Sequence, residues 1–311
     1  MGMDLDRIKH LVKKAGDDKI EILRIYKHTK ASEVYASVTF HYEGRKKWEG
    51  AVPIEYPRGG IYSETPEDAV QVIQKSYIYQ DPKREFEWKK IANEFWKKSS
   101  SKVTLPIFKA LLDSKWKCVS HLAQTNNPQR RIQDIKDKGF ILATDTNRFC
   151  KRCKKNTTHH ILLRFQSGVL RKYEGWSSTL RKKIIKVLGN RDVYEDRKAG
   201  ADILPDHKFP EARWDAKTSQ KNPDNMSEKQ IKRKFQLLNN RRNEQKREAC
   251  RTCYQTGKRG IIYGIKFYYE GNENWGKGIP KRGKGAEQGC VGCGWYDIEK
   301  WREELNKTLG N

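Results

Sequence analysis

Apolar residues recur at helix and strand spacings through the first hundred positions. Leu5, Ile8, Leu11 and Val12 share one helical face, and a period near two follows with β-branched and aromatic residues. The predicted elements are a helix over 4–15, two to four strands over 19–56 with turns at Gly44 and Gly50, and helices over 65–80 and 84–99. No recognisable chemistry falls here, so residues 1–100 are expected to form a recognition or scaffold module.

Residues 102–147 show three short apolar clusters at helical spacing and then an apolar strand. The expected elements are a helix capped by Thr104, a second helix with Val119 and Leu122 inward, a third from Asn127-Pro128 to Gly139 with Ile132 and Ile135 inward, and a strand over 140–146. This order resembles a winged helix-turn-helix, whose third helix enters the DNA major groove. The resemblance implies that polar residues of this helix contact base edges: Asn127, Gln129, Arg130, Arg131 and Gln133. The alternative is a small helical bundle with a solvated basic helix.

The pattern becomes less regular beyond residue 148. The expected elements are a strand ending at Asp206-His207, a polar loop over 216–229 ending in a helix capped by Ser227, a strand over 235–238, a polar helix from Asn239 or Asn240, a strand pair over 261–271 and a helix from Asp297. The whole is expected to be a multi-domain α+β protein, with modules over residues 1–100, 101–147 and 148–311.

The charge balance points to a polyanionic partner. Among 311 residues, 65 Lys and Arg oppose 39 Asp and Glu, for a net charge of +26. An excess of this size favours nucleic acid over a merely solvated basic surface. No apolar run reaches the length of a membrane span, and the first residues lack the apolar segment of a signal peptide. A cytoplasmic location is therefore expected.

The cysteines predict structural zinc. Six of the seven form three Cys-x-x-Cys pairs: Cys150/Cys153, Cys250/Cys253 and Cys290/Cys293. Each pair places two thiolates on one tight turn, which is half of a tetrahedral zinc site, and a redox role would need a βαβ pattern that is not evident. Three pairs leave two thiolates over, so one pair is expected either to use His159 and His160 or not to bind metal. About two zinc ions per chain are expected. Cys118 is interpreted as a buried core thiol.

The segment around Asp206-His207 suggests a nuclease. A strand ending in Asp-His, the second strand "FQLL" and a helix bearing Asn243 and Lys246 follow one another. This order resembles the HNH, or ββα-metal, nuclease fold over residues 202–253, although the two cysteines that some members carry inside the motif are absent. The family resemblance implies that His207 is the general base, that Asp206 and Asn243 hold a divalent cation such as Mg²⁺, and that Arg241 and Lys246 contact phosphates.

Two other interpretations stay open. A PD-(D/E)xK nuclease would use Asp206, Asp215 and Lys217, with residues 211–217 as a strand, but it leaves His207 and the Asn243 helix without a role. A zinc-bearing DNA-binding regulator without catalysis fits the charge and the cysteines equally well.

The pattern as a whole most resembles a type II restriction endonuclease that hydrolyses phosphodiester bonds of double-stranded DNA. Cutting both strands needs two active sites, so a homodimer on a palindromic site is the simplest expected assembly, with a monomer that cuts the strands in succession as the alternative. A companion DNA methyltransferase is expected in the same host.

Overall fold

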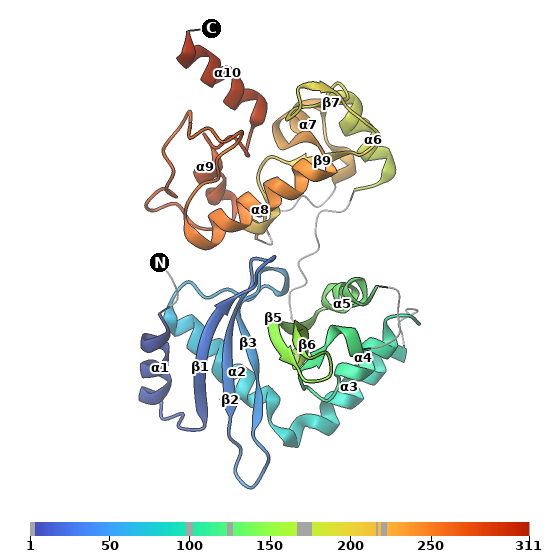
Figure 1. The fold of residues 1–311 in the computed structure, drawn as a ribbon, viewed down its shortest axis with the longest axis vertical. Coiled ribbons are helices and arrows are strands. Elements are labelled where there is room, and N and C mark those ends of the chain that lie inside the picture. The colour runs from blue at the N-terminus through green and yellow to red at the C-terminus, as the bar shows by residue number, and fades with distance from the viewer. Residues whose placement is uncertain are drawn as a thin grey trace. The chain divides into compact units, whose positions relative to one another are not determined.

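The structure is a computed structural model that describes residues 4–97, 102–122, 127–166, 176–215, 217–218 and 223–310. It divides into two compact units, residues 1–171 and 172–311, shown as ribbons in Figure 1. The expected boundaries at 100/101 and 147/148 do not coincide with this division. The reason is a shared core: Trp88 and Trp96 pack with Phe108 and with Phe140, and Phe140 opens a strand that continues past residue 147.

The first unit contains two three-stranded sheets and their helices (Figure 1). Its elements are α1 Leu5–Lys14, β1 Ile20–Lys27, β2 Val34–Phe40, β3 Trp48–Glu55, η1 Pro57–Gly59, α2 Pro66–Gln80, η2 Pro82–Arg84, α3 Glu85–Lys97, α4 Leu105–Leu111, β4 Lys117–Cys118, η3 Val119–His121, α5 Pro128–Asp137, β5 Phe140–Cys150 and β6 Lys155–Gln166. The helices expected over 4–15, 65–80 and 84–99 are confirmed, as is the strand after Gly139.

The first sheet runs β1-β2-β3, with each neighbouring pair antiparallel. The turn at Gly44 is confirmed, and Gly44 has a φ of 65°. The turn expected at Gly50 is wrong, because Gly50 lies inside β3 and is buried under the ring of Trp48. A Cβ there would lie 2.2 Å from a ring carbon, so glycine is required by a close approach and not by a turn.

The second sheet has the order β4-β6-β5, with α4, η3 and α5 leading into it. The third expected helix is confirmed as α5, whose N-cap is Asn127. The second is only the single 3₁₀ turn η3, preceded by the short strand β4. Thr104 does not cap α4 with its side chain; its hydroxyl instead lies 3.3 Å from Asp134 Oδ2 on α5.

The second unit contains two two-stranded sheets, β9-β10 and β7-β8, in its described residues. Its elements are α6 Ser178–Val187, β7 Arg191–Asp192, β8 Arg197–Lys198, β9 Ile203–His207, η4 Glu211–Arg213, η5 Pro223–Asn225, α7 Glu228–Lys234, β10 Phe235–Asn239, α8 Asn240–Thr256, η6 Lys284–Ala286, α9 Glu287–Cys290 and α10 Ile298–Leu309. The strands ending at His207 and over 235–238, the Ser227-capped helix and the Asp297-capped helix are confirmed.

The strand pair expected over 261–271 is wrong. That segment forms turns, with Tyr263 at φ 55° and Gly264 at φ 74°. Its aromatic side chains pack singly: the rings of Tyr263 and Phe267 lie 5.9 and 5.8 Å from Trp301. The aromatic side chains of this segment therefore pack locally against Trp301 and do not form one face of a β-strand.

Strands β9 and β10 pair antiparallel, with Asp206 opposite Gln236. Asn239 ends β10 and caps α8 by accepting a hydrogen bond from the backbone amide of Arg242 at 3.0 Å. Buried Asp192 holds that cap, because its Oδ2 accepts from the backbone and side-chain nitrogens of Asn239 at 3.1 and 2.9 Å. This cap fixes the start of helix α8 against the paired strands β9 and β10. None of the helices in the described ranges is long and apolar enough to cross a membrane.

Candidate active site and metal centres

The end of β9 and one face of α8 meet at Asp206. Its Oδ1 lies 3.2 Å from the Asn243 side-chain nitrogen, and its Oδ2 accepts a hydrogen bond from Gln236 at 3.1 Å. The sequence predicted that Asp206 and Asn243 act together, and the two side chains are neighbours. Rotating the Asn243 amide by half a turn would place an oxygen beside the carboxylate, which gives the hard oxygen donors that Mg²⁺ prefers.

Lys246 is one turn further along α8 and belongs to the same cluster. Its ammonium forms an ion pair with Asp206 Oδ2 and donates to the backbone oxygens of His207 at 2.5 Å and Lys208 at 3.3 Å. The Lys246 side chain is 3% exposed and faces Asp206, so in this structure it is not presented at the surface as the predicted phosphate contact would require. The Lys246 ammonium and the Gln236 amide contact Oδ2, whereas Oδ1 lies beside the Asn243 side chain. Arg241, on the same helix, is exposed as a phosphate contact requires.

His207 is held in an aromatic box. Its ring lies 4.6 Å from Phe235, 4.7 Å from Trp214 and 5.1 Å from Trp176, and the residue is 6% exposed. Glu211 Oε1 on η4 lies 3.4 Å from Nδ1. The Glu211 carboxylate therefore restricts how the imidazole ring can turn.

The residues of the alternative PD-(D/E)xK site do not form the expected strand. Residues 211–213 make the 3₁₀ turn η4, and Asp215 Oδ1 accepts hydrogen bonds from the Lys217 backbone amide at 3.0 Å and the Thr218 hydroxyl at 2.6 Å. Asp215 therefore stabilises its own turn.

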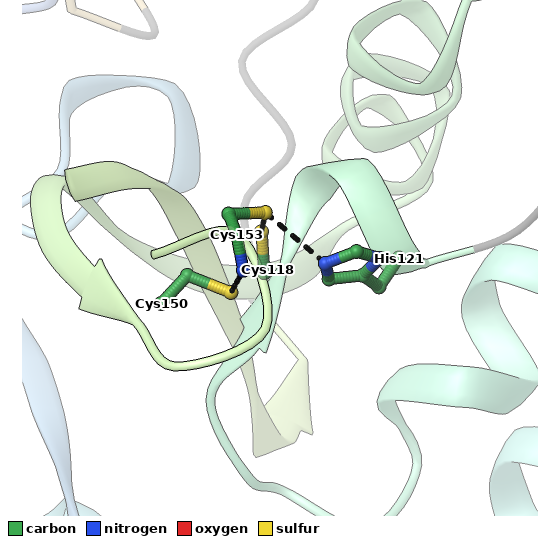
Figure 2. A group of neighbouring side chains, drawn as sticks. All are labelled: Cys118, His121, Cys150 and Cys153. Atoms are coloured by element: carbon green, nitrogen blue, oxygen red, sulfur yellow. Dashed lines mark hydrogen bonds between the residues drawn. The ribbon is translucent and has the colours of Figure 1, made fainter. Parts of the chain in front are cut away.

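A compact cysteine and histidine cluster lies in the first unit (Figure 2). Its ligand atoms, from Cys118, His121, Cys150 and Cys153, all lie within 4.8 Å of one another. Cys118 is the last residue of β4, and His121 is the last residue of η3. Cys150 is the last residue of β5, and Cys153 lies in the turn that follows it. The interpretation of Cys118 as a lone core thiol is wrong. A readable signal existed, since Cys118 and His121 are three positions apart and so form a Cys-x-x-His pair.

The spacing of these atoms suits a tetrahedral soft metal ion. The sulfurs of Cys118 and Cys153 are 3.8 Å apart, and zinc–sulfur bonds of about 2.3 Å in a tetrahedron require about that separation. Nε2 of His121 lies 3.1 Å from the Cys153 sulfur, and the Cys153 amide donates to the Cys150 sulfur at 3.4 Å. Three thiols and an imidazole with no carboxylate among them favour zinc over magnesium.

The acidity of the thiols is uneven within this cluster. Burial would raise the pKa of the Cys118 thiol, but hydrogen bonds from the Thr157 hydroxyl and the Ser120 amide lower it. Burial and the neighbouring Cys150 and Cys118 thiols raise the pKa of Cys153 to about 11. Without a positive charge, three thiolates repel one another; a divalent cation removes that cost.

His159 and His160 lie outside this cluster, so the proposed sharing of these histidines with Cys150/Cys153 is wrong. Both point from β6 into other contacts: His159 Nδ1 lies 3.1 Å from the Thr157 carbonyl, and His160 Nδ1 lies 3.0 Å from the Thr144 hydroxyl. Burial lowers the pKa of His160 to about 3, which keeps its ring neutral.

The other two cysteine pairs line one pocket in the second unit. Cys250 and Cys253 lie on helix α8 and not on a tight turn as expected, whereas Cys290 and Cys293 flank the end of α9, where Gly292 has a φ of 88°. In the described ranges, only the first cluster has all its ligand atoms within 4.8 Å. Burial raises the pKa of Cys290 to about 12, so that this thiol stays neutral without a metal.

The residues expected to contact bases lie at the start of α5, and most are engaged within the chain. Asn127 accepts from the Arg130 amide at 3.0 Å as the helix cap. The carboxylate of Asp134 pairs with Arg130 at 3.1 Å and with Arg131 at 2.7 Å. Gln133 donates to Asp137 at 2.9 Å, and Gln129 is exposed. These side chains could therefore contact base edges only by exchanging their hydrogen bonds and ion pairs within the chain for contacts with DNA.

Comparison with known proteins gives one partial similarity. A segment of 79 residues is 34% identical to the type II restriction enzyme NlaIII of Neisseria lactamica. That segment covers 24% of this chain and 30% of that enzyme, so the chain spans less than a third of the curated relative. No family model and no solved structure matches the chain.

Proposed function

We propose that this protein is a type II restriction endonuclease that hydrolyses double-stranded DNA at an HNH active site. The observation that carries the proposal is the approach of Asp206 Oδ1 to Asn243 at 3.2 Å, where strand β9 meets helix α8. Strands β9 and β10, which are joined through η4, η5 and α7, pair antiparallel and are followed directly by α8, an arrangement that supports a ββα-metal site. The partial similarity to a type II restriction enzyme supports the same activity.

Each residue of the site has a distinct role in the proposed reaction. Asp206 and Asn243 hold a hard divalent cation such as Mg²⁺, which neutralises the scissile phosphate and the leaving oxygen when bound. Lys246 fixes the Asp206 carboxylate through its other oxygen. His207 removes the proton of the attacking water, and Glu211 stabilises the imidazolium that forms. Arg241 contacts a phosphate from the exposed side of α8.

Zinc is proposed at two structural centres. The first is held by Cys118, His121, Cys150 and Cys153 in unit 1–171. The second uses the remaining four cysteines, which line the cavity of unit 172–311: Cys250, Cys253, Cys290 and Cys293. Two zinc ions per chain are expected, the number that the sequence predicted.

DNA sequence recognition is proposed for residues 102–166. The element order α4, β4, η3, α5, β5, β6 and the sheet order β4-β6-β5 are those of a winged helix, and they support α5 as the recognition helix. On this proposal Gln129, Arg130 and Gln133 contact base edges, while Arg131 and Asn127 hold the helix start. Residues 1–100 supply the scaffold, since β5 and β6 share its core.

The assembly follows from the substrate. Cutting both strands of a palindrome requires two active sites, so we propose a cytoplasmic homodimer. A companion DNA methyltransferase would protect the host genome from the same specificity.

Cleavage of a supercoiled plasmid in Mg²⁺ tests the activity. We expect wild type to give discrete fragments and His207→Ala to cut about 10² to 10⁴ times more slowly, which is the usual contribution of a general base. Asp206→Ala should lose Mg²⁺-dependent cleavage. Asp215→Ala is the matched control, because Asp215 accepts hydrogen bonds from the Lys217 amide and the Thr218 hydroxyl and has no role in the proposed reaction. Normal cutting by His207→Ala with loss in Asp215→Ala would favour the alternative nuclease.

A DNA-binding regulator is the competing function, and the burial of His207 within three aromatic rings favours it. Sequence-specific DNA binding with no cleavage in Mg²⁺, Mn²⁺, Co²⁺ or Ca²⁺ would decide for the regulator.

A further inference from the structure

Two arginines are buried beside the four cysteines of the second unit. Arg213, at the end of η4, is 2% exposed, and Arg259, after α8, is 8% exposed. Both line the same cavity as the cysteines. A guanidinium does not lose its proton in proteins, so two full positive charges are buried here.

The described contacts of Arg213 contain no negative charge. Nη1 donates to the Lys281 carbonyl at 2.9 Å, and Nη2 donates to the Cys253 sulfur at 3.1 Å. The guanidinium carbon lies 3.5 Å from the centre of the Trp275 ring. One of the four cysteines therefore receives a hydrogen bond from a buried cation.

Arg259 is also without a carboxylate in the described part of the chain. Nη1 donates to the carbonyls of Glu270 at 2.8 Å and Asn272 at 3.1 Å, and Nη2 donates to the Val291 carbonyl. Its buried Nε has no hydrogen-bond partner among the described atoms. Lys246, the third buried cation nearby, differs because Asp206 neutralises it.

Burying a cation without a counter-charge costs several kcal/mol. Four neutral thiols would leave both arginines uncompensated. Four thiolates around a divalent ion carry a net charge of −2 by formal count, which two guanidiniums neutralise. We propose that Arg213 and Arg259 are the counter-charges of a zinc tetrathiolate centre at Cys250, Cys253, Cys290 and Cys293.

Arg213 also connects this centre to the nuclease site, a consequence that rests on the proposed function. It ends the same 3₁₀ turn that begins with Glu211, the carboxylate beside His207. Its bond to Cys253 ties that turn to α8, which carries Asn243. Arg213 is therefore a positioning residue: the metal centre holds η4, and η4 holds Glu211 against the base.

Metal release from the purified full-length protein tests the charge role without using nuclease activity. The Cys118→Ser background removes the first cluster, so the zinc that remains belongs to the second. Zinc per chain and its transfer rate to a chromogenic chelator are measured for Arg213→Met, Arg259→Met and the control Arg247→Met, an exposed arginine of α8. We expect release about 10 times faster or more from the first two variants and an unchanged rate from the control.

Charge-conserving variants keep the test decisive if the Met variants fail to fold. Arg213→Lys and Arg259→Lys should retain one zinc per chain, with the blue-green absorption of a cobalt tetrathiolate after Co²⁺ substitution. Release from Lys variants as fast as from Met variants, or from Met variants as slow as from the control, would overturn the counter-charge role.

The outcomes separate this inference from the proposed function. No zinc in the Cys118→Ser background refutes the metal centre itself, whatever the nuclease does. Zinc release as expected in a protein that cuts no DNA supports the counter-charges and removes only the connection to His207. If both hold, Arg213→Met should lower kcat on a DNA duplex while the Kd for that duplex is unchanged.

Discussion

The two cysteine-rich centres differ in what surrounds them. The cluster of Cys118, His121, Cys150 and Cys153 has an exposed histidine and a half-buried Cys153. The four cysteines of the second unit face a cavity that two buried arginines share. Three thiolates and a neutral imidazole around zinc carry a formal charge of −1, and nearby water screens it. Four thiolates carry −2, and at a buried site the protein must supply the opposite charge.

The unit of residues 1–171, which holds the first cluster, also contains a buried cation, but this one is paired with a carboxylate. Lys136 on α5 reaches Glu33 across the sequence, with Nζ 3.1 and 3.2 Å from its two carboxylate oxygens. Both side chains are 9% exposed. Lys136 is neutralised by the Glu33 carboxylate. On our proposal, the counter-charge of Arg213 and Arg259 is the metal tetrathiolate, which forms only when an ion is bound. The stability of the second unit should therefore depend on metal far more than that of the first.

The largest expected effect is the loss of a ligand in the second unit. Cys290→Ser should lower the zinc content by one per chain and destabilise residues 172–311 by an amount on the order of 10 kcal/mol, because the binding free energy of structural zinc is folding free energy. Elemental analysis and calorimetric unfolding measure both quantities. Full stability with one zinc fewer would show that the arginines tolerate an empty cavity.

Breaking the carboxylate-paired cation should have the next largest effect. Lys136→Met removes the ammonium paired with the buried Glu33 carboxylate, at a cost of about 3 to 5 kcal/mol of unfolding free energy. The double variant Glu33→Gln, Lys136→Met should recover most of that loss, and a chelator should change neither result. A cost below about 1 kcal/mol in urea unfolding would mean that water reaches this pair.

Removing a ligand of the first cluster should cost less. Cys118→Ser should also remove one zinc, but two apolar cores independently support residues 1–171, so we expect a loss of about 1 to 3 kcal/mol. The unfolding transition of residues 172–311 should not move. If the two ligand variants destabilise the protein equally, the contrast between the centres fails.

The smallest expected effect is on pH dependence. Burial, reinforced by the charges of Lys136, His28 and His159, depresses the pKa of His160 to about 3, while an unfolded histidine titrates near about 6.5. The unfolded state thus binds more protons between these values, so stability is present above about pH 6.5 and falls as the pH drops toward 3, by at most about 1.4 kcal/mol per pH unit. His160→Gln should flatten this slope in urea midpoints between pH 7 and 5; an unchanged slope would assign it to other groups.

Local patterns were sufficient wherever a residue's role depends on its sequence neighbours. Helical periodicity with Thr65-Pro66 predicted α2, Ser227 predicted the start of α7, and "FQLL" followed by Asn239 predicted β10 and the start of α8. The approach of Asp206 to Asn243, which are 37 positions apart, was expected from the resemblance to a nuclease fold in which the first strand of a pair ends against the helix that follows the second strand. The strand pair over 261–271 failed because apolar aromatics serve a turn-rich core as well as a sheet.

By itself, the sequence determined many of the elements and the basic character, since spacing and composition are local quantities, and a family resemblance supplied the candidate nuclease residues. Only the tertiary structure decided that Cys118 and His121 join Cys150 and Cys153, because those pairs are about thirty positions apart and meet through the pairing of β4 and β5 with β6. Only the tertiary structure showed that Lys246 forms an ion pair with Asp206. It also showed that Arg213 and Arg259 lie beside the four cysteines of the second unit. Burial is what makes these cations need a partner, and the residues around them in the sequence did not predict that burial.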